Sequence, residues 1–154
     1  MGISEASKLL IDVLLVEDNP GDARLIKDTL HARNPSVRLH IACDGVEAMA
    51  FLLQQGEHFL APRPSLILLD LNLPRLTGRE VLSRIKGDEV LKTIPVIILT
   101  TSDSETDILN SYELQANCYL SKPVLLDDFE SVVNGIDDFW LTQVKLPKSK
   151  RSGR

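Results

Sequence analysis

The chain has 154 residues, of which 44% are hydrophobic and 25% charged, and its formal net charge is −5. This length suits a single domain that buries about two thirds of its unfolded surface, and no apolar run approaches the roughly 18 residues that a membrane-spanning helix needs. The totals argue against an integral membrane protein and against a basic protein that binds nucleic acid. We expect no nucleic-acid partner, no membrane contact and a cytoplasmic location, since the N-terminus has no secretory signal pattern.

The domain organisation is predicted from where charge and periodicity change. Residues 10–146 are predicted to form one domain, with an N-terminal extension at 1–9 and a tail at 147–154. The last ten residues carry five Lys or Arg and no acid, so the body of the chain is more acidic than the total suggests. A short basic segment of this kind is typically disordered.

Five short apolar runs alternate with amphipathic segments along the chain. The runs predict strands at 12–16, 37–42, 66–70, 95–99 and 118–121. Nearly continuous Val, Ile and Leu strands are typical of a parallel sheet that is covered on both faces. The predicted fold is therefore α/β: a three-layer α/β/α domain with a flavodoxin-like doubly wound sheet of five parallel strands, in the order 2-1-3-4-5, and five helices.

Capping residues predict where the helices between these strands begin. Asn19 followed by Pro20 predicts a helix after the first strand. The next three helices are each predicted from a capping residue three positions before a Glu. These pairs are Asp44 with Glu47, Thr77 with Glu80, and Ser102 with Glu105. The last helix is expected to begin near Leu126 and to carry one apolar stripe at Phe129, Val133, Ile136 and Trp140.

Acidic residues follow the first and third predicted strands. Glu17 and Asp18 end the first, and Asp70 ends the third. These strands are neighbours in the expected order, and two carboxylates 4 Å apart repel each other by about 1 kcal/mol in water and by more in a drier pocket. A hard divalent cation, Mg²⁺ (or Mn²⁺), would offset this repulsion because such ions prefer oxygen ligands. The sequence therefore predicts a metal site at this edge of the sheet.

The other strand ends supply the remaining groups for phosphoryl transfer. Thr100 ends the fourth strand and Lys122 follows the fifth. An aspartate can act as a nucleophile and become an aspartyl phosphate, while a cation, a lysine and a hydroxyl group interact with the transferred group. Asp70 is the candidate nucleophile, because it ends the central apolar strand.

Four motifs at these strand ends resemble those of receiver domains in two-component response regulators. They are VEDNP, LLDLNLPRLTG, ILTTS and YLSKP, and Thr100 and Lys122 lie 30 and 52 residues after Asp70. The resemblance covers roughly residues 10–145. The longer segments VEDNPGD and APRPSLILLDLNLPRLTGREVL are most similar to the single-domain regulators of cyanobacterial phytochrome histidine kinases.

This resemblance implies a role for each site residue. Asp70 would accept a phosphoryl group from a sensor histidine kinase, one of phytochrome type. Glu17, Asp18, Asp70 and the main-chain carbonyl of Asn72 would hold the metal. The protein would not be an enzyme in the usual sense, because it would catalyse only its own phosphoryl transfer and slow autodephosphorylation.

Further residues are assigned switch, structural and interface roles. By the same resemblance, Thr100 and Lys122 would bind the phosphoryl group, Thr100 and Tyr119 would form the switch, the Lys122–Pro123 peptide would be cis, and Pro74 and Gly78 would have structural roles. Adjacent helical residues point about 100° apart, so Phe139 and Trp140 cannot both face the core. We therefore expect a homodimer that uses the last helix or the face that this helix forms with the fifth strand.

Two other function classes fit the sequence poorly, and one alternative stays open. A flavodoxin-like cofactor enzyme needs a Ser/Thr/Gly-rich phosphate loop after the first strand, where this chain has acids. An aspartyl phosphatase of the haloacid dehalogenase type needs D-x-D there, and this chain has EDN. The alternative is a receiver-fold docking or dimerisation module that acts without phosphorylation.

Overall fold

A five-stranded parallel sheet forms the centre of the computed structural model, which describes residues 10–147. Neighbouring strands lie in the order β2-β1-β3-β4-β5, as predicted. The extension at 1–9 and the tail from residue 148 lie outside the described residues. The strands are β1 (Ile11–Val16), β2 (Val37–Ala42), β3 (Leu66–Leu69), β4 (Val96–Thr100) and β5 (Cys118–Ser121).

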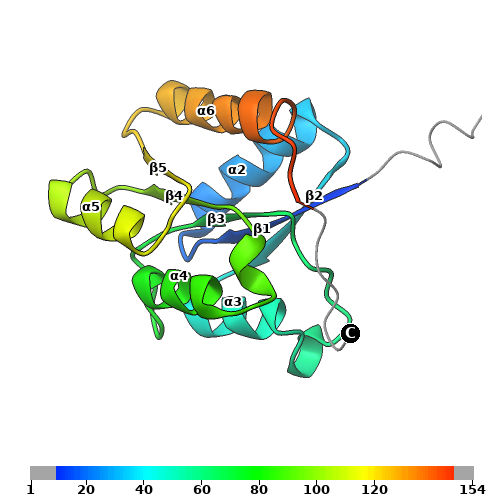
Figure 1. Cartoon of the computed structure of the whole chain (residues 1–154). Helices are drawn as coiled ribbons and strands as arrows, with labels where there is room; N and C mark the ends of the chain where they lie inside the picture. The colour runs from blue at the N-terminus through cyan, green and yellow to red at the C-terminus, as the bar shows by residue number, and fades with distance from the viewer. Residues whose placement is uncertain (1–9, 148–154) are drawn as a thin grey trace, which may run out of the picture.

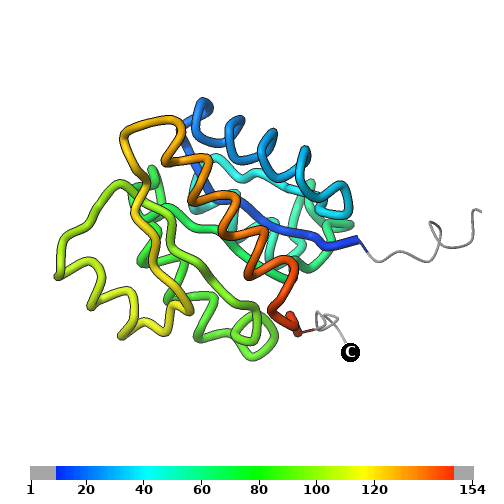
Figure 2. Tube along the Cα trace, turned by 90° about the horizontal axis from the view of Figure 1, so that it is seen from above, coloured from blue at the N-terminus to red at the C-terminus, as the bar shows by residue number. Residues whose placement is uncertain are grey.

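Helices cover both faces of this sheet (Figure 1). Seen from above, α2 and α6 run side by side across one face (Figure 2). The helices α3 and α4 lie on the other face, with α5 beside β4 and β5 (Figure 1). The α-helices of residues 10–147 are α2 (Pro20–Arg33), α3 (Gly45–Leu52), α4 (Gly78–Gly87), α5 (Glu105–Glu113) and α6 (Leu126–Gly135), which continues as a π-helical segment, Ile136–Trp140. The predicted α/β/α fold is confirmed. None of these helices is long and apolar enough to cross a bilayer.

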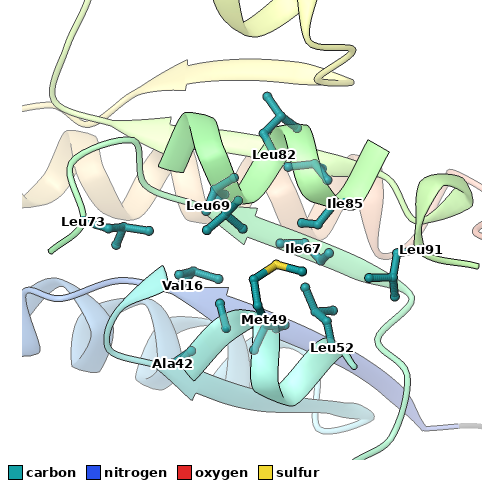
Figure 3. Packing of buried hydrophobic residues seen from close by; sticks show 14 of the residues in the cluster. Val16, Ala42, Met49, Leu52, Ile67, Leu69, Leu73, Leu82, Ile85 and Leu91 are labelled. Carbon is teal, nitrogen blue, oxygen red and sulfur yellow. The ribbon is translucent and has the colours of Figure 1, made fainter. Parts of the chain in front are cut away.

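Each face of the sheet has its own hydrophobic core, because successive side chains of a strand point to opposite faces. Val16, Ile67 and Leu69 pack against Met49 of α3 and Leu82 of α4 (Figure 3). On the opposite face of the sheet, the strand side chains that point the other way pack against α2 and α6. This second core includes Val13, Leu15, Leu68, Ile26 and Val133. The apolar runs therefore reflect burial on both sides.

The capping predictions are confirmed for three of the four helices to which they apply. Asn19, Asp44 and Thr77 each accept a hydrogen bond from the backbone three residues on, and Thr77 forms a complete capping box. The prediction for the fourth is wrong, since Ser104 caps α5 by accepting from the Asp107 N–H at 3.0 Å. The segment SDSETD contains the Ser-x-x-acid pattern in two registers, so the pattern alone cannot select one.

Gly78 allows the loop after β3 to fold back against the strand end. A Cβ at this position would lie 2.3 Å from the Asp70 carbonyl oxygen and 2.5 Å from the Leu71 Cα. The same approach lets the Gly78 N–H donate to the Leu71 carbonyl at 3.0 Å, while the Leu76 N–H donates to the Pro74 carbonyl at 2.8 Å in the intervening turn. The close contact of α4 with this loop fixes the backbone around Asp70.

Gly78→Ala should destabilise the protein by about 3 kcal/mol, because the new methyl group overlaps backbone atoms that cannot move independently. Gly87→Ala is the matched control, since a Cβ at Gly87 meets nothing within 4 Å. The control should be neutral or slightly stabilising. Urea unfolding of both variants measures the difference, and equal stabilities would contradict the close approach at Gly78.

Candidate functional site

Three carboxylates meet at the carboxyl edge of the sheet. Glu17 and Asp18 follow β1, Asp70 follows β3, and each contributes an oxygen that lies within 4.8 Å of the other two. Glu17 and Asp70 are buried and Asp18 is exposed. The predicted acidic group is thus brought together in an arrangement that can hold a divalent metal ion.

Strand register places these residues next to one another. Val16 pairs with Leu69, and the Asp70 N–H donates to the Val16 carbonyl at 3.1 Å. The Asp70 Oδ1 accepts from the Thr100 hydroxyl at 2.8 Å and from the Asn72 N–H at 3.0 Å. Thr100 is itself fully buried. One oxygen of the candidate nucleophile is therefore held by a hydroxyl group and a main-chain amide.

Lys122 brings the compensating positive charge. Its Nζ lies 2.5 Å from Glu17 Oε1 and 2.9 Å from Asp70 Oδ2, and its side chain is only 3% exposed. A third carboxylate, that of Asp22, lies 3.0 Å from the same nitrogen. A buried charge is tolerated when it is paired and hydrogen-bonded. The lysine therefore offsets part of the repulsion among the carboxylates. The sequence alone predicts that a metal ion offsets all of it.

Burial and charge shift the pKa values of this pair. The pKa of Glu17 is raised to about 7, first by burial, while the hydrogen bond from Lys122 opposes the shift and the charge of Asp70 adds to it. Burial alone would lower the pKa of Lys122, but its bonds to Glu17 and Asp70 raise that pKa above the ordinary value. For Glu17, loss of hydration outweighs the attraction of the lysine. Its carboxyl group therefore takes up a proton more readily than an exposed glutamate.

Tyr119 is connected to the loop that follows Thr100. The Tyr119 side chain is half-buried, and its hydroxyl donates to the carbonyl of Ser102, two residues after Thr100, at 2.9 Å. The Ser102 hydroxyl donates to Asp107 at 2.5 Å, and Arg79 of α4 forms an ion pair with that carboxylate. Tyr119 of β5 is thus linked to α5 and α4 through Ser102, which lies two residues after the other predicted switch residue, Thr100.

The prediction of a cis peptide before Pro123 is wrong. Every peptide bond within residues 10–147 is trans. For an X-Pro bond the two isomers differ by only about 0.5–1 kcal/mol, so a proline after Lys122 does not by itself decide the isomer. The Asn72 carbonyl remains a predicted metal ligand.

Two residues at the site were not predicted from the sequence. Asp22 contacts Lys122, and Ser102 joins Tyr119 to Asp107. The only sequence signal for Asp22 is its place three residues after the Asn19 cap, which is a common position for an acid in a first helical turn. Nothing local in the sequence indicates that a lysine 100 residues later reaches it.

The predicted dimer residues lie in the π-helical segment, Ile136–Trp140, that continues α6. Phe139 is 53% exposed and Trp140 is half-buried, with their rings in an edge-to-face contact at 5.8 Å. Both line an apolar groove of about 290 Å³ between α6 and the edge strand β5. The other lining residues are Cys118, Leu120, Ser131, Val132, Gly135 and Ile136.

A doubly wound parallel sheet with an acidic group, a buried hydroxyl and a buried lysine at its carboxyl edge is the architecture of receiver domains in response regulators. The model of the response regulator receiver domain family matches residues 13–134, and the chain belongs to this family.

Known relatives narrow this assignment. The chain is 53% identical, over 135 residues, to the response regulator Rcp1 of Synechocystis; the alignment covers 88% of this chain and 92% of Rcp1. The crystal structure of the Mn²⁺-bound form of Rcp1 matches with a TM-score of 0.87 at 52% identity, over 90% of this chain and 99% of that one. The phosphorylated cyanobacterial phytochrome response regulator RcpA matches with a TM-score of 0.88 at 48% identity, with the same coverage. The chain is therefore a receiver-domain response regulator related to a phytochrome response regulator.

Proposed function

We propose that Asp70 accepts a phosphoryl group from a phosphohistidine of a sensor kinase, and that the protein signals through altered protein contacts. The observation that carries this proposal is the environment of the Asp70 carboxylate. One oxygen accepts a hydrogen bond from the Thr100 hydroxyl, and the other accepts one from the Lys122 ammonium. The carboxylates of Glu17 and Asp18 lie beside them. Donors already aimed at a reacting carboxylate need little reorganisation when charge develops there.

The chain's own residues account for the transfer. An Asp70 oxygen forms a bond to phosphorus as the bond between phosphorus and the imidazole nitrogen breaks, and the imidazole leaves with that electron pair. The Lys122 ammonium and the Thr100 hydroxyl then donate hydrogen bonds to the phosphoryl oxygens. In the later hydrolysis, a water oxygen bonds to phosphorus as the bond between phosphorus and the Asp70 oxygen breaks, which returns the Asp70 carboxylate; the protons of the water go to the released phosphate and to solvent. The protein thus acts only on its own side chain.

The acidic group is proposed to hold Mg²⁺ or Mn²⁺. Glu17, Asp18 and Asp70 would supply carboxylate oxygens, and the Asn72 main-chain carbonyl would supply a fourth ligand, which suits a hard cation that also keeps bound waters. The cation, when bound, neutralises negative charge on the phosphoryl group. Support comes from the clustering of the three carboxylates and from the Mn²⁺-bound form of the relative Rcp1.

Incubation of the whole chain with acetyl phosphate tests the proposal. The intact mass should rise by about 80 Da, the mass of one phosphoryl group, when Mg²⁺ is present. Removal of the cation with EDTA should prevent the gain. No gain under either condition would refute phosphorylation and favour a docking module that does not depend on it.

The proposed partner is a sensor histidine kinase of phytochrome type, by analogy with RcpA. An exposed apolar segment supports a protein contact beside the site. Val124, Leu125 and Leu126 follow the Lys122–Pro123 pair and are 100%, 66% and 59% exposed. Apolar side chains exposed in succession next to a reactive group mark a surface that a protein partner covers.

Leu125→Glu should slow phosphotransfer from a phytochrome-type histidine kinase by about tenfold, since an interface residue of this kind contributes about 1–2 kcal/mol. The rate with acetyl phosphate should not change, because that small donor does not need the surface. Leu60→Glu is the matched control, as Leu60 is 82% exposed on the loop that precedes β3. Equal effects on both donors would contradict a partner surface at Leu125.

A homodimer through the groove between α6 and β5 is the second proposed contact. Phe139→Glu should convert a dimer to a monomer in sedimentation velocity, because it puts a charge into the apolar groove. Tyr112→Glu on α5, where the residue is 48% exposed, should leave the dimer intact. A monomeric wild-type protein, with and without phosphorylation, would remove the proposal.

A further inference from the structure

Lys122 has a carboxylate partner that the proposed function does not use. An ammonium group has three N–H donors, and the Lys122 Nζ has three carboxylate neighbours: Glu17, Asp70 and Asp22. The Asp22 oxygen lies at 3.0 Å, as close as an ordinary hydrogen bond, and its side chain is 28% exposed. The contact joins the first turn of α2 to the end of β5.

Asp22 differs from the other two partners in its relation to the metal site. Glu17 and Asp70 have oxygens within the compact acidic group, whereas among the described residues Asp22 is not a member of that group. In the proposed function, the cation engages Glu17 and the phosphoryl group occupies Asp70. Two of the lysine's three partners therefore change during the reaction, and the carboxylate of Asp22 does not.

The start of α2 holds Asp22 in place. The Asp22 N–H donates to the Asn19 Oδ1 at 3.0 Å, and the Asn19 N–H donates to the Glu17 Oε2 at 3.2 Å. The Asp22 carboxylate also lies in the first helical turn, where free main-chain N–H groups favour negative charge. The turn that carries the acidic pair after β1 thus also fixes the third partner of Lys122.

We infer that Asp22 is a positioning residue, which holds the Lys122 ammonium beside Asp70 while the cation and the phosphoryl group engage the other carboxylates. A lysine side chain has a flexible four-carbon stem, and a fixed anchor limits the positions that its ammonium group visits. The ammonium is then in place for the phosphoryl oxygen when transfer occurs. This inference rests on the proposed function, because it assigns a role in phosphorylation of Asp70.

The test is the initial rate of phosphorylation of the full chain by acetyl phosphate at saturating Mg²⁺, followed by intact mass. Asp22→Asn keeps the size of the side chain and removes its charge. The rate should fall by roughly three- to tenfold, as expected when a charge-assisted hydrogen bond that orders a reacting group is weakened. Asp28→Asn is the matched control: it removes one charge from the same helix, and its side chain is 67% exposed. Its rate should match the wild type.

A conservative variant separates positioning from a structural role. Asp22→Glu restores a carboxylate that can reach the ammonium, so it should recover most of the rate. A wild-type rate for Asp22→Asn would overturn the inference and leave the proposed function intact. Loss of rate in both Asp22→Asn and Asp22→Glu would also overturn it, because the effect would then follow the shape of the helix start. Failure of the wild-type chain to gain mass would instead refute the proposed function.

Discussion

Asp70→Asn should gain no phosphoryl mass from acetyl phosphate, whereas the wild-type chain gains about 80 Da. The amide that replaces the carboxylate is not a nucleophile for phosphorus, although it can still accept the Thr100 hydroxyl. Among residues 10–147, no other carboxylate accepts hydrogen bonds from both Thr100 and Lys122. Glu17 also pairs with Lys122, but the Thr100 hydroxyl donates to Asp70 and not to Glu17, and Asp18 is exposed at the rim of the site. We therefore expect complete loss rather than a reduced rate.

The control for this variant is an acid at the same edge of the sheet but outside the acidic group. Asp103 is exposed in the loop after β4, so Asp103→Asn should be phosphorylated like the wild type. Tryptic mapping of the wild-type product should locate the added mass in the peptide that contains Asp70. A mass gain that persists in Asp70→Asn would show that the phosphoryl group lies elsewhere and would contradict the assigned nucleophile.

The fold could be predicted well from the sequence, because strands that are buried on both faces have nearly continuous apolar residues. Runs such as LILL at 66–69 have no polar member, since both sides of β3 are covered. Once the strand order is set, the positions of Glu17, Asp70 and Thr100 follow, because the carboxyl ends of neighbouring parallel strands meet at one edge. The acidic group could therefore be predicted without any knowledge of side-chain positions.

The features that could not be predicted depend either on contacts between residues far apart in the sequence or on alternatives that the local sequence does not distinguish. The cap of α5 is Ser104 rather than Ser102, and both registers satisfy the same local pattern. The isomer before Pro123 rests on a small free-energy difference. The contact between Lys122 and Asp22 spans 100 residues and depends on how a flexible side chain packs. Such features are set by the tertiary structure, so no local pattern encodes them.

The way in which the site is neutralised is also a tertiary property. Repulsion among the carboxylates predicts that a cation binds between them, and the sequence favours a metal ion as that cation. The ammonium of Lys122 is however already bound to two of the carboxylates that the metal would use. Metal and lysine should therefore compete for Glu17.

Lys122→Ala should lower the free energy of unfolding of the metal-free protein by about 3 kcal/mol, as when a buried carboxylate loses its ionic partner. Protonation of Glu17 limits the loss, because burial already raises the pKa of that group to about 7. A ligand at 100 times its dissociation constant adds about 2.7 kcal/mol to the stability of the form that binds it. Since no lysine competes for Glu17 in the variant, a fixed concentration of Mg²⁺ should stabilise Lys122→Ala more than the wild type.

Urea unfolding with and without Mg²⁺ measures both effects, and Lys86→Ala provides the control. Lys86 is also partly buried and makes three hydrogen bonds, but its partners are two carbonyls and the Asn117 amide oxygen, remote from the acidic group. Its replacement should lower stability without changing the response to Mg²⁺. If Mg²⁺ instead stabilised Lys122→Ala less than the wild type, the lysine would assist metal binding, for example by holding Glu17 in position. The competition between Mg²⁺ and Lys122 for Glu17 would then be wrong. The stability of Lys122→Ala without Mg²⁺ separately tests whether the lysine acts as a counter-charge in the metal-free protein.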